Sequence, residues 1–333
     1  MATTFKAFRV EEQGDEFARG VETMTLDDLP AGEVTVRVAY SSLNYKDALS
    51  ATGNRGVTKN FPHTPGIDAA GTVVSSKDSA FSEGDEVIVT SYDLGMDTPG
   101  GFGEVIRVPA DWVVPLPEGL SLTEAMALGT AGFTAALCVD ALEQQGFEDG
   151  PVIVTGASGG VGSVAVALLA KAGREVVAST GSESAHEMLK TLGASRIVPR
   201  DDLSETSERP MLKGVYGGAV DTVGGTTLVN LVKQLKPHAS VAACGLVGGV
   251  DLKLSVYPFI LRGVNLLGID SQTCPMEKRR RVWEKLGGEW KLNLSNITKE
   301  IGLEELDASI DAILKGETQG RVRVKVADDL HDE

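Results

Sequence analysis

The sequence predicts an α/β protein with two domains, a partly closed β-barrel domain and a doubly wound parallel-sheet domain. Its 333 residues exceed what one hydrophobic core ordinarily fills. Short alternating runs broken by glycine and proline occupy residues 1–115, whereas short β-branched runs alternate with helical segments after residue 151. We therefore expect residues 1–120 and 270–333 to form the barrel domain, and residues 121–269 to form the parallel-sheet domain.

The barrel domain is predicted from strand-like runs and from the turns between them. The first ten residues are typical of a strand, and Val34–Val38 and Glu86–Thr90 are short β-rich runs. Glycine and proline mark turns, as at Pro65-Gly66. A helix around residues 277–287 and a final strand Arg321–Val326 are expected to return to this domain.

The second domain is predicted from the regular alternation of strands and helices. A capping box formed by Ser121 and Glu124 opens its first helix, and further helices are expected to start near Gly160, Glu183 and Thr227. This alternation implies a parallel sheet covered on both faces through right-handed crossovers. The expected strands are Pro151–Thr155, Glu175–Thr180, Arg196–Val198, Ala219–Val223, Ser240–Cys244 and Val264–Ile269.

Charge and hydropathy exclude several classes of partner. The chain has 47 acidic and 31 basic residues and a net charge of −16, which repels nucleic acid and anionic membranes. No run of 18 or more apolar residues is present, so we expect no membrane span. Because the N-terminal residues lack the apolar core of a secretory signal, the cytoplasm is the expected location. The separated cysteines Cys138, Cys244 and Cys274 form no metal motif, and at least two are expected to be buried.

The strongest functional signal is the glycine-rich loop after the strand that ends near Thr155. Its key positions are Ala157, Gly159 and Gly162, an AxGxxG variant of the Rossmann dinucleotide-binding fingerprint. Small residues permit a tight turn and a close approach of the backbone to a pyrophosphate, and the following helix offers free N–H groups. The alternative is a tight turn whose glycines serve packing alone. The expected phosphate-binding residues are Ser158, Gly159, Gly160 and Val161.

The end of the next strand predicts which dinucleotide is bound. NAD sites place an acid at the end of this strand. This chain instead has Thr180, Gly181 and Ser182, whose hydroxyl and N–H groups can donate hydrogen bonds to a 2′-phosphate. Arg200 adds a possible charge-assisted contact, unless it is a solvated surface charge. NADPH is therefore favoured. If Glu183 turned inward, NADH would compete.

Several motifs together resemble the medium-chain dehydrogenase/reductase superfamily over essentially the whole chain. They are the glycine-rich loop, Asn44–Asp47, Pro65–Val73, Gly84–Val87 and Gly129–Ala135. The resemblance implies a GroES-like barrel as the catalytic domain beside the Rossmann domain. Zinc enzymes of the superfamily carry Cys where Asn44 stands and Gly-His-Glu where Gly66-Ile67-Asp68 stands. Since His63 alone makes a poor zinc site, we expect no metal.

Within the superfamily, the chain resembles the quinone-oxidoreductase-like branch and, in it, the acrylyl-CoA reductases. That likeness rests on Ser41–Leu49, Asn60–Pro62, Ala242–Leu246, Pro258–Arg262 and Gln319–Arg321. One departure is Ser182, where relatives carry a basic residue; this leaves more of the recognition of a 2′-phosphate to Arg200. The resemblance implies NADPH-dependent reduction of the C=C bond of acryloyl-CoA or a similar thioester, with hydride reaching the β-carbon and a proton the α-carbon.

The same resemblance assigns roles to individual side chains. Tyr45 is expected beside the nicotinamide, where its hydroxyl orients the ring or passes a proton; the alternative is a half-buried packing residue. Asn44 is expected to donate a hydrogen bond nearby, and Arg321 to reach cofactor or substrate, unless it is a surface charge. The residues expected to line the nicotinamide half are Leu246, Ile260 and Ser271.

Three further questions stay open at this point. The basic run Lys278–Arg281 either binds the nucleotide end of coenzyme A or is a solvated helix face. The competing functions are a quinone or enone reductase using NADPH, and a non-enzymatic NADPH-binding protein. An exposed sheet edge near Val264–Ile269 favours a homodimer.

Overall fold

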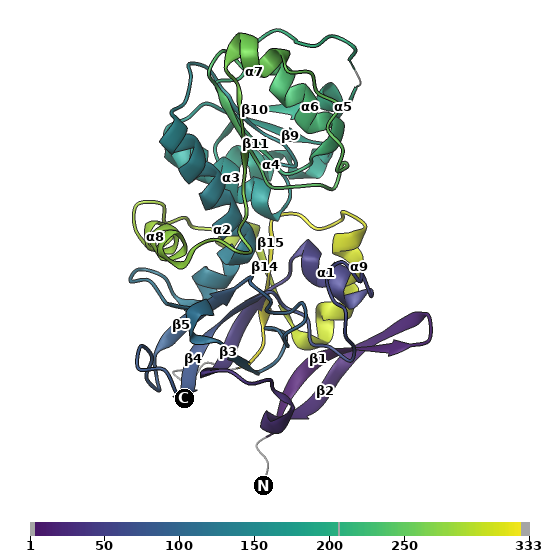
Figure 1. Ribbon diagram of the computed structural model, residues 1–333, viewed down its shortest axis with the longest axis vertical. Coiled ribbons are helices and arrows are strands. Elements are labelled where there is room, and N and C mark those ends of the chain that lie inside the picture. The colour runs from purple at the N-terminus through teal and green to yellow at the C-terminus, as the bar shows by residue number, and fades with distance from the viewer. Residues whose placement is uncertain (1–3, 206, 328–333) are drawn as a thin grey trace. The chain divides into compact units, whose positions relative to one another are not determined.

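The computed structural model describes residues 4–205 and 207–327, which form two compact units. One unit contains the described residues up to 130 and those from 272 onward, and the other contains residues 131–271. Figure 1 follows the chain from the first unit through the second and back. The division falls inside one long helix, whereas the sequence placed the domain boundary before that helix.

The first unit is built on a bent sheet with the order β14-β15-β3-β4-β5-β7, and β6 also pairs with β3. A long hairpin of β1 and β2 joins this framework through single bridges from Ala7 to Gly103 and from Val10 to His63. These pairings form the predicted partly closed barrel. Its strands are β1 (Thr4–Gln13), β2 (Glu16–Thr25), β3 (Val34–Ser42), β4 (Asp68–Ser76), β5 (Glu86–Thr90), β6 (Val105–Val108), β7 (Val113–Pro115), β14 (Thr298–Gly302) and β15 (Arg321–Lys325).

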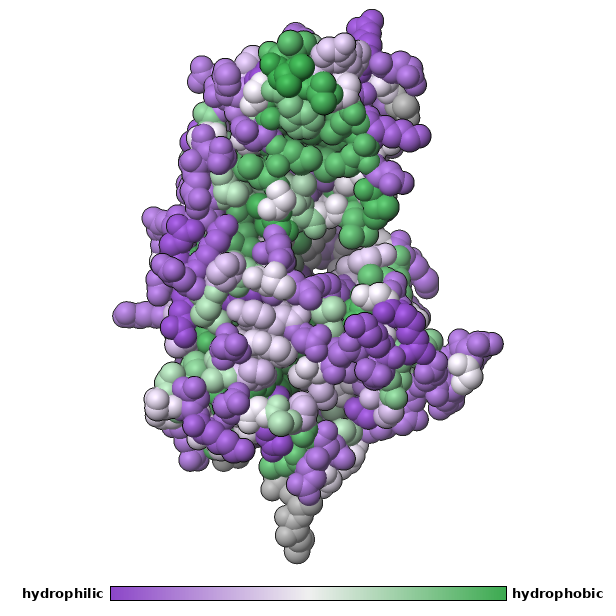
Figure 2. Space-filling view, viewed as in Figure 1, coloured by the Kyte–Doolittle hydropathy of each residue, from purple (hydrophilic) through white to green (hydrophobic). Residues whose placement is uncertain are grey.

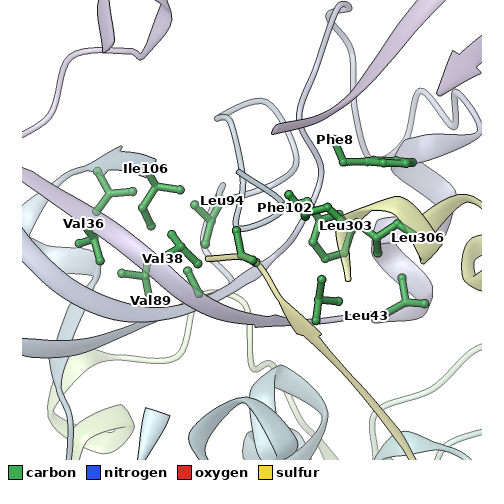
Figure 3. Packing of buried hydrophobic residues seen from close by; sticks show 14 of the residues in the cluster. Phe8, Val36, Val38, Leu43, Val89, Leu94, Phe102, Ile106, Leu303 and Leu306 are labelled. Atoms are coloured by element: carbon green, nitrogen blue, oxygen red, sulfur yellow. The ribbon is translucent and has the colours of Figure 1, made fainter. Parts of the chain in front are cut away.

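The core of this unit gathers inward-facing side chains of the strands and two C-terminal leucines, Leu303 and Leu306 (Figure 3). The rings of Phe8 and Phe102 meet edge to face, with centroids 6.4 Å apart. Each large apolar side chain buried in this way contributes roughly 1.5–3 kcal/mol to folding. The helices of the unit are α1 (Tyr45–Ala51), α8 (Met276–Gly287), α9 (Leu306–Leu314) and the 3-10 turns η1 (Leu26–Asp28), η2 (Ala110–Trp112), η4 (Ser295–Ile297) and η5 (Leu303–Glu305).

The second unit contains the predicted parallel sheet, with the order β10-β9-β8-β11-β12-β13. The order reverses between β8 and β11, and ligands of doubly wound sheets bind at the carboxyl ends of the strands beside such a reversal. All six expected strands are present, and β13 stands at an edge as predicted. They are β8 (Val152–Val154), β9 (Val176–Thr180), β10 (Ala194–Pro199), β11 (Gly218–Asp221), β12 (Ser240–Ala243) and β13 (Asn265–Gly268).

Helices cover both faces of this sheet. Right-handed crossovers place α3 and α4 on one face and α5 and α6 on the other. The second face is packed by one apolar cluster that includes Leu203 of α5, Leu228 and Leu231 of α6, and Phe259 of α7. The bounds are α3 (Gly160–Lys171), η3 (Glu183–Ala185), α4 (His186–Thr191), α5 (Asp201–Ser204), α6 (Gly225–Gln234) and α7 (Tyr257–Arg262).

Helix α2 (Leu122–Gln145) begins at the capping box that the sequence predicted. The Ser121 N–H donates to Glu124 Oε2 at 3.0 Å, and the Glu124 N–H donates to Ser121 Oγ at 3.2 Å. By length and composition α2 could cross a membrane, but 89% of its most apolar window is buried inside the protein, as in a core helix. The helix is interrupted at Gly129, whose backbone has φ 53° and ψ −158°.

Candidate functional site

The glycine-rich loop joins β8 to α3 and places the predicted phosphate-binding residues around one helix N-terminus. Gly159 is the N-cap of α3, and Ser158, Gly160 and Val161 are all partly exposed. A Cβ added at Gly162 would lie 2.3 Å from the Gly156 carbonyl oxygen, so only glycine lets the helix start this close to the turn. The first N–H groups of α3 have no partner within the helix and are available to an anion.

The end of β9 brings together the residues predicted to choose between the two nicotinamide cofactors. Thr180 Oγ1 donates to Ser158 Oγ at 3.0 Å and accepts from the Ser182 N–H at 3.1 Å. The Arg200 N–H donates to the Thr180 carbonyl at 3.1 Å, and a Cβ built at Gly181 would lie 2.9 Å from the Arg200 guanidinium carbon. The Arg200 guanidinium and the hydroxyl groups of Thr180 and Ser158 therefore lie around the end of β9, which we call the corner.

Glu183, the acid that could reverse this preference, is exposed and opens the short turn η3 directly after Ser182. The donor set at the end of β9 thus fits a 2′-phosphate better than a free 2′-hydroxyl, which needs an acceptor.

Asp221, at the end of β11, is a buried acid that was not predicted from the sequence. It is buried, its Oδ1 accepts from Thr155 Oγ1 at 2.7 Å, and its Oδ2 accepts from the Gly224 N–H at 2.7 Å. Burial raises the pKa of this carboxyl, while the two hydrogen bonds oppose the shift. Asp221 thereby fixes the turn after β11 to the strand that begins the glycine-rich loop.

The three residues predicted to line the nicotinamide half lie on separate segments of the second unit. Leu246 follows β12 and is 61% exposed, and Ile260 lies on α7 and is 69% exposed. Ser271 follows β13 and is partly exposed. Both apolar side chains are thus open to a ligand, and their roles stay predictions.

The first unit holds a buried polar cluster around Asn44 and Asp68. Asn44 is the N-cap of α1, Tyr45 is its first residue, and Asp68 begins β4. Asn44 is 8% exposed and Tyr45 41% exposed, so the tyrosine ring is the more accessible of the two. This exposure is compatible both with a role beside a bound cofactor and with the alternative of a half-buried packing residue, so the role of Tyr45 stays a prediction.

The hydrogen bonds of Asn44 correct one expectation. Its Nδ2 donates to Asp68 Oδ2 at 2.8 Å and to the Ser42 carbonyl at 3.2 Å, which uses both amide hydrogens. Asn44 therefore has no side-chain hydrogen left to donate to a substrate, and only its Oδ1 remains to accept.

Arg321 is 2% exposed, so the alternative of a surface charge on the last strand is wrong. Its Nε donates to the Ala127 carbonyl at 2.9 Å. Burial lowers the pKa of the guanidinium, and the charges of Asp68 and Asp47 oppose that shift. The arginine is thus the cation of the buried cluster and is enclosed by protein.

Asp47 is the second acid of the cluster, and its spacing from Asn44 marks it in the sequence. It stands three residues after the N-cap Asn44, which is the capping-box spacing. Its Oδ2 accepts from the Asn44 N–H and its Oδ1 from the Ile67 N–H, both at 2.7 Å. Complete burial, and then the charge of Asp68, raise the pKa of Asp47 to about 7.

The basic run on α8 is only partly a solvated helix face. Arg279 is 0% exposed and donates to the carbonyl and hydroxyl oxygens of Thr90 at 3.0 and 2.9 Å. Its guanidinium lies 4.4 Å from the centre of the Tyr92 ring. Arg280 and Arg281 are exposed, so these two can meet an anion.

Comparisons with known proteins match both units. The alcohol dehydrogenase GroES-like domain family matches residues 30–118, and the zinc-binding dehydrogenase family matches residues 160–288. The chain is 49% identical to the putative quinone oxidoreductase YhfP of Bacillus subtilis, over 98% of this chain and 100% of that one. It is 48% identical to the probable acrylyl-CoA reductase AcuI of Escherichia coli, over 96% of this chain and 99% of that one.

Solved structures with the same fold carry two different cofactors. The Escherichia coli YhdH structure with bound NADPH has a TM-score of 0.93 and 48% identity, covering 96% of this chain and 100% of that one. The Bacillus subtilis yhfP structure with NAD bound has a TM-score of 0.94 and 49% identity, covering 97% of this chain and 100% of that one.

The match to a zinc-binding family raises the question of a metal, and the donor set does not fit one. Among the described residues no group of three or more histidine, cysteine, aspartate or glutamate side chains could hold an ion. Ile67 is apolar, and the Asn44 amide nitrogen donates to Asp68. The lone pairs of Asp68 are already engaged by four hydrogen bonds.

Proposed function

Since the chain belongs to the medium-chain dehydrogenase/reductase superfamily, in the branch of the acrylyl-CoA reductases and quinone-oxidoreductase-like proteins, we propose that it is an NADPH-dependent acrylyl-CoA reductase. It reduces the C=C bond of acryloyl-CoA, or of a similar α,β-unsaturated thioester, without a metal. The observation that carries the proposal is the set of donor groups at the end of β9, which suits the 2′-phosphate of NADPH.

The cofactor half of the proposal rests on the second unit. The N–H groups around Ser158–Val161 hold the pyrophosphate, and Arg200, Thr180 and Ser182 hold the 2′-phosphate. NADPH in the Escherichia coli relative supports this choice, whereas NAD in the Bacillus subtilis relative shows that the branch takes both. A higher kcat/KM with NADPH than with NADH is expected, and a preference for NADH would contradict it.

The chain's own residues position the reaction. When bound, NADPH supplies the hydride that the β-carbon receives. Tyr45 presents an accessible hydroxyl at the start of α1, which orients the nicotinamide ring or relays a proton. Asn44 accepts through Oδ1, because its amide hydrogens are engaged. Arg321, being buried, acts on the site through the charge it places beside Asp68 and not by touching substrate.

The role of Tyr45 has a direct test. Tyr45→Phe keeps the ring and removes the hydroxyl, so kcat should fall while the affinity for NADPH is kept. Unchanged kinetics would reject a chemical role for that hydroxyl.

The substrate is tested with a panel followed by NADPH absorbance. Acryloyl-CoA is expected to be turned over with a higher kcat/KM than a simple quinone or an alkenal. The second candidate, a quinone or enone reductase, is favoured by the 49% identity to a putative quinone oxidoreductase, and it would show the reverse order. Binding of NADPH without oxidation by any acceptor would instead support the non-enzymatic alternative.

The proposal also covers the partners, the location and the oligomeric state of the enzyme. An acyl-CoA is the small-molecule partner, nucleic acid and membranes are not partners, and the cytoplasm is the location. A homodimer forms through β13, an edge strand whose Leu266 is 36% exposed.

A further inference from the structure

Four hydrogen bonds converge on the carboxylate of Asp68, which is 0% exposed. Oδ2 accepts from Ser42 Oγ at 2.5 Å, from Asn44 Nδ2 at 2.8 Å and from the Thr130 N–H at 2.9 Å. Oδ1 accepts from Thr130 Oγ1 at 2.5 Å. The donors come from the end of β3, the N-cap of α1 and the interrupted part of α2. One side chain thus ties three separate segments together.

The four donor groups suit a carboxylate side chain at this position. Each of them donates, and a carboxylate offers two oxygens that can accept several hydrogen bonds. An asparagine amide would turn one N–H₂ group toward these donors and leave at least one of them unpaired.

The interruption of α2 serves this arrangement. Gly129 has φ 53°, and a Cβ there would lie 2.2 Å from Ser42 Oγ and 2.6 Å from Asp68 Oδ2. The glycine lets the chain pass this close, and the residue after it, Thr130, then offers both its N–H and its hydroxyl to Asp68.

The hydrogen bonds of Asp68 fix the side chain of Asn44 and the first turn of α1, which begins after it. Because Asp68 and the Ser42 carbonyl take both amide hydrogens of Asn44, the direction of its Oδ1 is fixed. Tyr45 is the next residue and the first of α1, so the start of this helix is held by the same bond.

We propose that Asp68 is a positioning residue for the reductase reaction, which fixes the Asn44 amide and the first turn of α1 that carries Tyr45. This inference rests on the proposed function. Asp68 touches neither substrate nor cofactor and acts through the three residues that donate to it, Ser42, Asn44 and Thr130. Loss of one partner should therefore slow turnover and leave the binding of NADPH unchanged.

Two adjacent serines provide a matched test. Ser41 and Ser42 are both 0% exposed, but Ser41 Oγ donates to the backbone carbonyl of Asp68 at 2.6 Å, whereas Ser42 Oγ donates to its carboxylate. Both S41A and S42A lose one buried hydroxyl, so similar losses of stability are expected. Only S42A should lower kcat, by about tenfold, with KM for acryloyl-CoA within about twofold of the wild type.

A second variant and a second measurement strengthen the test. D68N should lower kcat by about a hundredfold, while its Kd for NADPH, from nucleotide fluorescence, matches the wild type. With NADPH deuterated at the transferred position, the isotope effect on kcat should rise in S42A and D68N and not in S41A.

The outcomes separate the two proposals. A wild-type protein that reduces no acceptor in the panel sinks the proposed function. An active wild type in which S41A and S42A have equal kcat values and equal isotope effects sinks the positioning role of Asp68, and so does a D68N variant with wild-type kcat.

Discussion

Asp47 holds a proton in the folded protein at a pH where most carboxyl groups are ionised. Its side chain is 0% exposed, and burial, followed by the charge of Asp68, raises its pKa from 3.8 to about 7. The other charged group that faces it is Arg321. Between about pH 4 and pH 7 the native state binds one proton more than the unfolded state, so this group's contribution to stability is lost as pH rises through that window.

Replacing Asp47 by asparagine should remove that pH dependence. The wild type loses up to about 1.4 kcal/mol per pH unit from this group between those limits, and D47N should lack that component. The measurement is urea unfolding at several pH values from 5 to 8, with D15N in the exposed hairpin turn as the control for loss of one charge. A D47N curve parallel to the wild type would show that Asp47 is ionised throughout.

Arg200 should determine the choice of cofactor. Its guanidinium lies against Gly181, next to Thr180 and Ser182. A charge-assisted hydrogen bond is worth about 1.5–3 kcal/mol, so R200A should lower kcat/KM with NADPH by roughly 10- to 100-fold and leave NADH nearly unaffected. R196A removes another exposed arginine of β10 and is the control. Equal losses with both cofactors would mean that Arg200 does not read the 2′-phosphate.

At the scale of elements, two glycines with positive φ, one inside α2 and one directly after it, differ in how closely other atoms surround them. Gly129 interrupts the helix and Gly146 follows its end, and both have positive φ, 53° and 85°. A Cβ at Gly129 would collide with Ser42 Oγ and Asp68 Oδ2, but a Cβ at Gly146 would meet nothing within 4 Å.

The two alanine variants should therefore differ in stability. G146A should cost about 1 kcal/mol, the usual penalty for a left-handed alanine, whereas G129A should cost about 3 kcal/mol or more. Denaturant unfolding monitored by circular dichroism measures both. Equal costs would indicate that the cluster around Asp68 moves aside freely.

Local sequence patterns predicted most helices and strands. They did not predict contacts between residues that are far apart in the sequence. The strands of the second unit, α3 and the capping box of α2 each follow from neighbouring residues. Helices α1, α7 and α9 were not predicted, since short segments carry little periodic signal.

The candidate site likewise has parts that local motifs predict and parts that they do not. The glycine-rich loop and the corner at Thr180 are local motifs and were predicted, whereas the cluster joining residues 42, 44, 68 and 130 has no local signature. Arg279 and Arg321 were not predicted to be buried, because a charged residue in sequence gives no sign that Thr90 or Ala127 will meet it.

At the scale of the whole molecule, the net charge of −16 opposes the binding of any anion. A nucleotide must therefore be held by local groups, and the groups we propose are the N–H groups at the start of α3 and the Arg200 guanidinium. Cys138 and Cys274 are buried and Cys244 is half-buried, so the expectation that at least two thiols serve as small core residues is confirmed.

The second unit also carries an exposed apolar surface on α7 and just before it. Figure 2 shows hydrophobic residues gathered over the part of the chain that includes α7. Val256, Ile260 and Leu261 are 61–69% exposed, and β13 has an unpaired edge. Exposed apolar residues beside an open edge strand are typical of an interface between copies.

A dimer through β13 predicts that one charge on this strand will separate the copies. L266K should convert a particle of twice the chain's mass into one of the single mass, because a lysine on an edge strand opposes pairing. Light scattering coupled to size-exclusion chromatography measures this mass, and circular dichroism checks folding. V250K places the same charge on a side chain that is 75% exposed in the loop after β12, off the edge strand, and should remain a dimer. A wild type that elutes as a single chain, or an L266K variant that stays dimeric, would exclude this edge as the interface.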